Sequence, residues 1–299
     1  MDHPTEPVES DVPPNRFPWL TISAVVWCIL VWAAITAESE KRGLTPETMR
    51  KWGAVSGHDV WQGQYSALLS SVFVHTELWH LAGNCFWLMW FGTLLERRLG
   101  KLRYLLFFAT SAFVSSSFQL GASGEIGFGA SGVVYAMFGL LLPLRKRWRE
   151  VDEFMSGYVI ALSLVWLVAC VILTRLNLMP IANAAHFAGL TFGLAISSSI
   201  RKWRTRLCTT VIVGHVALSL LFLVWCPWST AWLTQQAYKL HAERRYHEAI
   251  QVYSKIIEKE PENSWAYHNR ASANQSLGRD REAASDLETA TKLDVRAAK

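Results

Sequence analysis

The chain has 299 residues, 51% of them hydrophobic, with 15 tryptophans and a formal net charge of +5. The hydrophobic residues come in long runs, which is typical of an integral membrane protein rather than a water-soluble domain. Basic residues cluster directly after apolar runs, so the positive charge indicates membrane topology and argues against nucleic-acid binding.

Seven apolar runs are long enough to be membrane-embedded helices. They cover about residues 17–37, 78–95, 104–121, 131–144, 156–174, 183–200 and 207–227. Residues 1–16 form a polar, mainly acidic tail, unlike the cationic start of a cleaved signal peptide, so the first run is expected to be a retained span. The sequence therefore predicts an all-α polytopic membrane bundle with a core over 17–206 and a seventh span over 207–227.

The basic clusters predict the orientation of the chain. They lie at residues 97–103, 145–149 and 201–206, after the second, fourth and sixth runs. The positive-inside rule places all three in the cytoplasm. The N-terminus is then cytoplasmic and the C-terminus lies outside, as expected for a multi-pass protein of the cell membrane whose partner is the lipid bilayer.

Two apolar runs are too short to cross a membrane, and each begins with a reactive side chain. Ser131 opens a run of 14 residues, which covers about 21 Å of a roughly 30 Å hydrocarbon layer. His186 opens a run of 15 residues, about 22 Å long. Both side chains are therefore expected at one depth inside the bilayer, as a nucleophile and its base require.

Each of these residues also has a structural interpretation. A serine between glycines often serves close helix packing, and Gly132-x-x-x-Ala136 fits that pattern. An intramembrane histidine is costly and therefore favours a functional role. Gly189 and Gly193 give the helix of His186 a smooth face, which suits close contact with the helix that carries the serine.

A third group of polar residues lies in the second run. His80 and Asn84 are four residues apart and share one helical face. Asn84 begins a 13-residue stretch, about 20 Å of helix, and so matches the depth of Ser131. Its amide donates the hydrogen bonds that a developing oxyanion requires, and His80 is a further donor. His75 and His80 lack a third ligand at metal spacing, so neither a metal nor another cofactor is predicted.

The chain changes character after Pro227. Residues 230–299 are polar and charge-balanced, and two stretches within them align at a constant offset. The matched pairs are Ala237 with Ala271, Ala249 with Ala283, Tyr253 with Leu287, and Ile256 with Ala290. This offset equals the period of tetratricopeptide repeats, about 34 residues, and the region resembles them.

The resemblance to these repeats is incomplete. Arg244 stands where the second unit has the turn glycine Gly278. The alternative is a plain pair of amphipathic helical hairpins. Two units are fewer than such arrays need, so the seventh span or a partner protein is expected to cap them.

Four ordered motifs run through residues 64–200. They are His75-x4-His80-x3-Asn84, Glu96-Arg97-Arg98-Leu-Gly100, Gly129-Ala-Ser131-Gly132 with Tyr135, and Ala185-His186-x2-Gly189-x3-Gly193. Together they resemble the rhomboid intramembrane serine proteases. The resemblance implies a six-helix core, to which the seventh span of this chain is added. It departs at Ser66-Ala67, where the family's outer loop often carries Trp-Arg, and the docking of that loop stays open.

The resemblance also implies the roles of the site residues. His186 deprotonates Ser131, and the oxyanion is held by Asn84, His80 and the backbone N–H of Ser131. Tyr135 stacks on the imidazole, and the motif glycines Gly129, Gly132 and Gly189 support the dyad.

The chemistry of the dyad can also be argued from the residues. A serine hydroxyl needs an adjacent base, and no carboxylate lies in the runs of Ser131 and His186 to form a triad. Packing against Tyr135 can then hold the imidazole in orientation. The Gly-rich connection 121–129 is suited to line a water-filled cavity open to the outer face.

If His186 is the general base, the ratio kcat/KM should rise with pH through the pKa of His186 and flatten above it.

These features predict a serine endopeptidase that cleaves single-span membrane proteins near the outer face, at helices with Gly or Pro near their outer end. A member of the same fold that binds membrane clients without cutting them is the alternative. A transporter ranks third, since the sequence shows no inverted repeat. Residues 230–299 are expected outside the cytoplasm, where they would recruit substrates or a protein partner.

Overall fold

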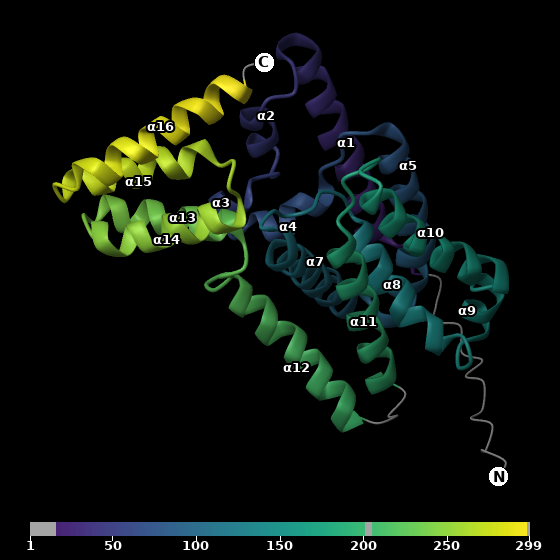
Figure 1. Ribbon diagram of the computed structural model, residues 1–299. Coiled ribbons are helices and arrows are strands. Elements are labelled where there is room, and N and C mark those ends of the chain that lie inside the picture. Colours follow the sequence, from purple (N-terminus) through teal and green to yellow (C-terminus); the bar gives the residue numbers. More distant parts are fainter. Residues whose placement is uncertain (1–15, 201–204, 298–299) are drawn as a thin grey trace. The chain divides into compact units, whose positions relative to one another are not determined.

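The computed structural model describes residues 16–200 and 205–297, and every regular element in them is a helix (Figure 1). The chain divides into two compact units, Met1–Leu223 and Val224–Lys299. The predicted polar tail, apart from Arg16, lies outside the described residues. So do Arg201, Lys202 and Arg204 of the third basic cluster.

The apolar runs all form helices in the first unit. Four helices are long and apolar enough to cross a membrane: α1 (Trp19–Arg42), α7 (Lys101–Ser123), α10 (Gly157–Arg175) and α12 (Thr205–Phe222). The second run is a continuous helix made of α5 (Leu78–Trp87), a π-helical turn labelled η2 (Leu88–Gly92) and α6 (Thr93–Leu99). The two short runs are α8 (Ser131–Leu144) and α11 (Asn183–Ile200).

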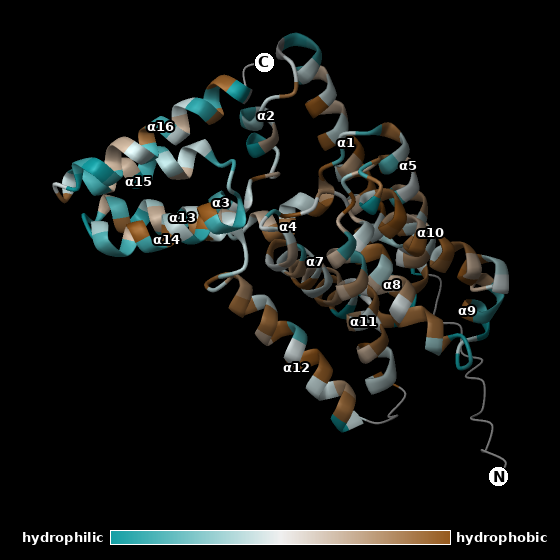
Figure 2. Cartoon of the chain, viewed as in Figure 1, coloured by the Kyte–Doolittle hydropathy of each residue, from teal (hydrophilic) through white to brown (hydrophobic). Residues whose placement is uncertain are grey.

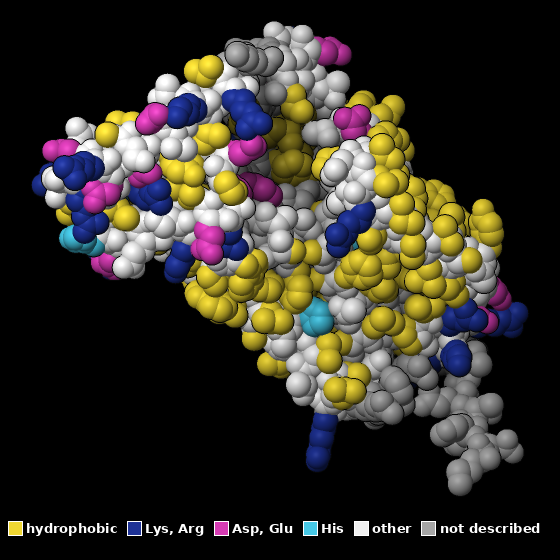
Figure 3. Space-filling view, in the orientation of Figure 1, with side chains coloured by type: hydrophobic (Ala, Val, Ile, Leu, Met, Phe, Trp, Pro, Cys, Tyr) yellow, Lys and Arg dark blue, Asp and Glu magenta, His cyan; other side chains and the backbone are white. Residues whose placement is uncertain are grey.

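The seventh run is helical over a shorter range than predicted. Helix α12 ends at Phe222, so the run 207–227 is not helical to its end. Pro227 disfavours helical geometry at the residue before it, which limits how far the helix can extend. Along the first unit the helices are coloured predominantly hydrophobic in Figure 2, and many of their hydrophobic side chains are exposed (Figure 3). An apolar surface of this kind suits contact with lipid.

Helix α8 forms the centre of the first unit, with most of its residues buried. It packs against α11 through residues that have no side chain. A methyl group on Gly189 would collide with the carbonyl of Gly132, and one on Gly193 with the carbonyl of Ala136. Gly139 faces the backbone of Leu190 in the same way. The two backbones therefore lie closer than larger residues would permit.

A buried carboxylate ties α6 to the start of α1. Glu96 is 2% exposed and accepts hydrogen bonds from the backbone N–H of Leu20 at 3.0 Å and of Thr21 at 2.8 Å. The Thr21 hydroxyl donates to the same carboxylate at 2.9 Å. The first N–H groups of a helix lack partners within it, and the positive end of its dipole favours an anion. Glu96 therefore caps α1 and is itself satisfied.

The connection between α1 and α5 contains α2 (Pro46–Lys51), α3 (Gly57–Trp61), α4 (Ala67–Ser70) and a 3-10 turn labelled η1 (Ser71–Phe73). It docks on the end of α7 through an apolar cluster of Val55, Val60, Ala67, Leu68, Leu120 and Ile126. Two polar contacts flank this cluster. The N–H of Gly57 donates to Glu125 at 2.8 Å, and the Trp61 indole donates to the carbonyl of Phe222 at 3.0 Å.

Ala67 is 2% exposed within this cluster. Of the two residues at which the sequence departs from the rhomboid resemblance, only Ala67 packs in this cluster, whereas Ser66 is exposed.

The second unit consists of α13 (Thr230–Ala242), α14 (Tyr246–Lys259), α15 (Ser264–Ser276) and α16 (Asp280–Ala297). The start of α15 follows that of α13 at the same offset at which α16 follows α14. Arg244 and Gly278 occupy equivalent turns and both have positive φ, +60° and +71°. The left-handed turn conformation is therefore kept although only the second unit has glycine there. The second unit has its own apolar core, which contains Leu233, Ala237, Ala249, Tyr253 and Ile256.

A pH-dependent contact in the connection between α1 and α5 gives a first prediction. Burial alone would raise the pKa of Asp59, but hydrogen bonds from Ser56 and the nearby Arg50 outweigh it and hold that pKa below its ordinary value. A carboxylate with a lowered pKa stabilises the fold fully above its unfolded value of about 3.9, and this stabilisation is lost as pH falls through the folded value. We expect limited proteolysis of the connection to accelerate below about pH 4 in the wild type.

Asp59→Asn should be cleaved faster than wild type at pH 7 and should lose most of the acid-induced change. Glu47→Gln is the control, because Glu47 lies in the same connection without an ion pair among the described residues. An Asp59→Asn protein with the wild-type acid response would contradict this assignment.

Candidate active site

The two reactive side chains at the starts of the short helices meet. Ser131 is the first residue of α8, and His186 lies in the first turn of α11. The hydroxyl oxygen of Ser131 is 2.8 Å from Nε2 of His186, and the histidine is 3% exposed. This distance permits direct proton transfer from the hydroxyl to the imidazole.

The imidazole is positioned by packing. The ring of Tyr135 lies 4.9 Å from that of His186 between centroids, with the planes inclined by 39°, so the contact is tilted and not a parallel stack. The Tyr135 hydroxyl donates to the carbonyl of Ser163 on α10 at 3.1 Å. Among the described residues, Nδ1 of His186 has no hydrogen-bond partner. Among the described residues, the imidazole is thus positioned by ring packing and by the Ser131 contact, without the carboxylate of a triad.

His75, which the sequence analysis gave no role in the site, is the hydrogen-bond partner of Asn84. Its Nδ1 is 3.2 Å from the carbonyl of Phe73, and its Nε2 is 3.0 Å from the amide nitrogen of Asn84. A carbonyl only accepts, so Nδ1 carries the proton and Nε2 accepts from the amide. This contact fixes the orientation of Asn84 and leaves its second N–H for another acceptor.

Gly129 allows α5 to approach the start of α8 closely. Its φ is +95°, a conformation that favours glycine. A methyl group at this position would lie 2.6 Å from Cε1 of His80 and 3.2 Å from the amide nitrogen of Asn84. The N–H of Gly129 donates to the carbonyl of Ser71 at 3.1 Å, which fixes the turn.

The first N–H groups of α8 lack partners within the helix, and Ser131 is its first residue. The Asn84 amide and the His80 ring lie close to Gly129, two residues before Ser131, and they line the same cavity as Ser131.

A cavity of about 1330 Å³ contains this group of residues. It is lined by the reactive pair, by Tyr135, His80 and Asn84, and by part of the Gly-rich connection, namely Glu125, Ile126, Gly127 and Phe128. Carboxylates of Asp59 and Glu77 also line it. A cavity of this size, with a mostly apolar wall that carries these polar groups, can hold water and an extended peptide segment.

Gln119 on α7 holds the start of α11 in place, which the sequence analysis missed. Its side-chain oxygen accepts from the N–H of Ala184 at 3.1 Å and of Ala185 at 3.4 Å. These are first-turn N–H groups, which need an outside acceptor. Because the partners lie on helices far apart in the sequence, no local pattern indicates the contact.

His215 lies on α12 and does not line the site cavity. Its Nε2 is 2.9 Å from the Thr191 hydroxyl, and its ring packs on Phe118.

Part of the chain is similar to known proteins. Residues 62–203 match the family model of the rhomboid domain. The rhomboid protease GlpG of Serratia proteamaculans is 32% identical over 187 residues, 62% of this chain and 63% of that protein. The rhomboid protease GlpG of Enterobacter sp. is 31% identical over 177 residues, 59% of this chain and 61% of that protein. The rhomboid protease GlpG of Salmonella choleraesuis is 29% identical over 193 residues, 61% of this chain and 67% of that protein.

The chain thus spans about 63% of the length of the Serratia relative. These matches support the rhomboid family and an integral membrane protein. The matched domain ends before the second unit begins.

The role of Gln119 can be tested by its contribution to stability. Gln119→Ala removes the acceptor for two helix N–H groups and should lower the free energy of unfolding by about 1 kcal/mol, as loss of a helix cap does. Gln119→Glu keeps an acceptor oxygen and should retain most of the stability. Gln62→Ala, at an exposed glutamine that contacts only His58 among the described residues, is the control. Thermal unfolding in detergent measures all three, and equal stability of Gln119→Ala and wild type would contradict the capping role.

Proposed function

We propose that this chain is an intramembrane serine endopeptidase that uses Ser131 as nucleophile and His186 as general base. The observation that carries the proposal is the 2.8 Å contact between the Ser131 hydroxyl and Nε2 of His186, in a cavity that His80 and Asn84 also line. The rhomboid protease relatives support the same class of activity.

The reaction follows from this geometry. His186 takes the proton of the Ser131 hydroxyl at Nε2 as the serine oxygen attacks the peptide carbonyl. The negative charge that develops on the carbonyl oxygen is stabilised by the N–H of Ser131, the free N–H of Asn84 and the His80 ring. His186 then delivers its proton to the leaving amine as the C–N bond breaks. Water from the cavity hydrolyses the acyl-enzyme by the same steps in reverse order.

The substrate proposed is a single-span membrane protein. A transmembrane helix hydrogen-bonds its own carbonyls, so the scissile segment must unwind before it can reach Ser131. Gly or Pro near the outer end of the substrate helix lowers the cost of this unwinding. The positive-inside rule places the basic clusters 97–103 and 145–149 in the cytoplasm, so cleavage is proposed near the outer face.

Substitutions in the site should separate the roles of its residues. Ser131→Ala and His186→Ala should abolish cleavage of a generic single-span substrate, because each removes one half of the proton-transfer pair. Asn84→Ala should lower kcat by about 10²- to 10³-fold, the usual effect of losing one oxyanion donor.

Thr191→Ala is the control on α11, outside the site cavity, and should cleave at the wild-type rate. The assay measures initial rates in detergent for proteins shown to be folded. Undiminished cleavage by Ser131→Ala would contradict the mechanism. A folded wild type that does not cleave would favour the alternative, a protein that binds membrane clients without cutting them.

We further propose that the second unit acts outside the cytoplasm as a recruitment module built of two tetratricopeptide-like repeats. The regular offset between its two helix pairs and its separate core support this interpretation. Leu287, the counterpart of the buried Tyr253, is 44% exposed, so the last repeat leaves an apolar position for a further element or a protein partner.

The topology can be tested by accessibility. In a background without the native cysteines, Lys255→Cys at an exposed position of α14 should react with a membrane-impermeant maleimide on intact cells. Lys146→Cys, exposed in the basic cluster after α8, is the matched control and should react only after lysis. Protection of the residue 255 cysteine until lysis would place the repeats in the cytoplasm.

A further inference from the structure

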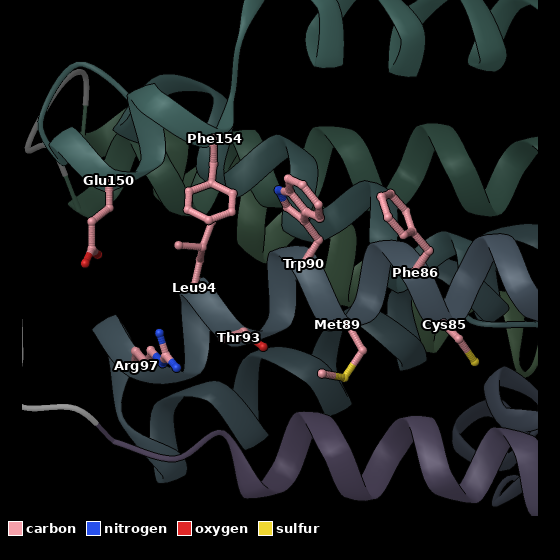
Figure 4. Close-up of a pocket in the computed structure, with 9 residues that line it drawn as sticks. All are labelled: Cys85, Phe86, Met89, Trp90, Thr93, Leu94, Arg97, Glu150 and Phe154. Atoms are coloured by element: carbon pink, nitrogen blue, oxygen red, sulfur yellow. The ribbon is translucent and has the colours of Figure 1, made fainter.

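A second cavity, of about 530 Å³, runs along the helix formed by α5, η2 and α6, opposite the short helix α9 (Arg149–Phe154). None of its lining residues lines the cavity of Ser131 and His186. Figure 4 shows Phe86 and Trp90 along one side of the helix, Phe154 next to them, and Arg97 and Glu150 at the end away from Cys85. We call this feature the α5–α9 groove.

Aromatic rings form a continuous apolar wall in the groove. The ring of Phe86 lies 5.3 Å from that of Trp90, and Trp90 meets Phe154 edge-on at 5.3 Å. These side chains remain between 36% and 51% exposed although they contact one another. A wall that is rigid, apolar and accessible suits an apolar chain laid along it.

The length of the groove matches one leaflet of a bilayer. Cys85 and Arg97 are twelve positions apart on a continuous helix, which corresponds to about 18 Å. Half of the hydrocarbon core measures about 15 Å. An acyl chain that starts at the membrane boundary near Arg97 would therefore end near the midplane at Cys85.

The end of the groove carries an unneutralised cation. Glu150, the nearest carboxylate in the lining, is paired with Arg98 at 3.0 Å, and Arg98 also lies over the ring of Trp148. Within residues 16–200 and 205–297, Arg97 forms no ion pair, and its Nε is buried without a hydrogen-bond partner. An arginine in this state at a membrane boundary is suited to bind a phosphate group.

We propose that the α5–α9 groove binds an anionic glycerophospholipid of the leaflet on the basic side. Its phosphate pairs with Arg97, and one acyl chain lies along Phe86, Trp90 and Phe154. A zwitterionic phospholipid carries the same phosphate with a cation attached, so its net attraction to Arg97 is weaker. The inference does not depend on proteolytic activity, because lipid retention is the property it concerns.

The test uses the full chain purified in detergent and incubated with an equimolar mixture of phosphatidylglycerol and phosphatidylcholine. Native mass spectrometry then measures which lipid stays bound. The wild type should retain phosphatidylglycerol preferentially. Arg97→Gln should lower its apparent affinity about tenfold, the effect of losing one charge-assisted contact. Arg97→Lys keeps the charge and should retain the preference in part.

Arg103→Gln is the matched control, because Arg103 is an exposed arginine of the same basic cluster that does not line the groove. It should bind phosphatidylglycerol as the wild type does. Equal retention of the two lipids by the wild type would overturn the proposal, as would equal losses in Arg97→Gln and Arg103→Gln. Displacement of the lipid by a single-span peptide in the wild type but not in Arg97→Gln would assign the groove to a protein helix instead.

Discussion

The backbone contact between α8 and α11 is the constraint on which the rest of the first unit depends. At Gly139, Gly189 and Gly193 even a methyl group would collide with the facing helix. Such close approach gains dispersion energy over a long interface. This gain matters in a membrane because lipid tails are as apolar as the side chains, so the hydrophobic effect does not drive the helices together. It also sets Ser131 and His186 at a fixed separation, since each lies at the start of one of these helices.

A pair held in this way needs little electrostatic support. In a site surrounded by lipid, a buried carboxylate beside His186 would carry a large desolvation cost. The described structure uses an aromatic ring there instead, and Tyr135 is anchored to α10 by its hydroxyl. Two polar side chains satisfy N–H groups where helices begin: Glu96 at α1 and Gln119 at α11. Each supplies an acceptor that lipid cannot provide.

The sequence predicted those parts of the molecule that depend on local pattern. Apolar runs located the helices, and the distance of Ser131, His186 and Asn84 from the next basic cluster indicated a shared depth. His75 and Gln119 could not be assigned in this way. His75 lies in an extended segment before α5 without helical periodicity, and Gln119 acts on a helix far along the chain. The end of α12 was placed too late because apolar residues continue beyond the helix.

Above all, we propose that Ser131 is a nucleophile activated by His186. Covalent labelling of the purified full chain with a fluorophosphonate, followed by mass spectrometry to locate the adduct, tests this most directly. We expect a single adduct on Ser131. It should be lost in Ser131→Ala and should form much more slowly in His186→Ala, since a serine without its base is a poor nucleophile. Labelling of Ser131 at the same rate in His186→Ala, or an adduct elsewhere on the chain, would contradict it.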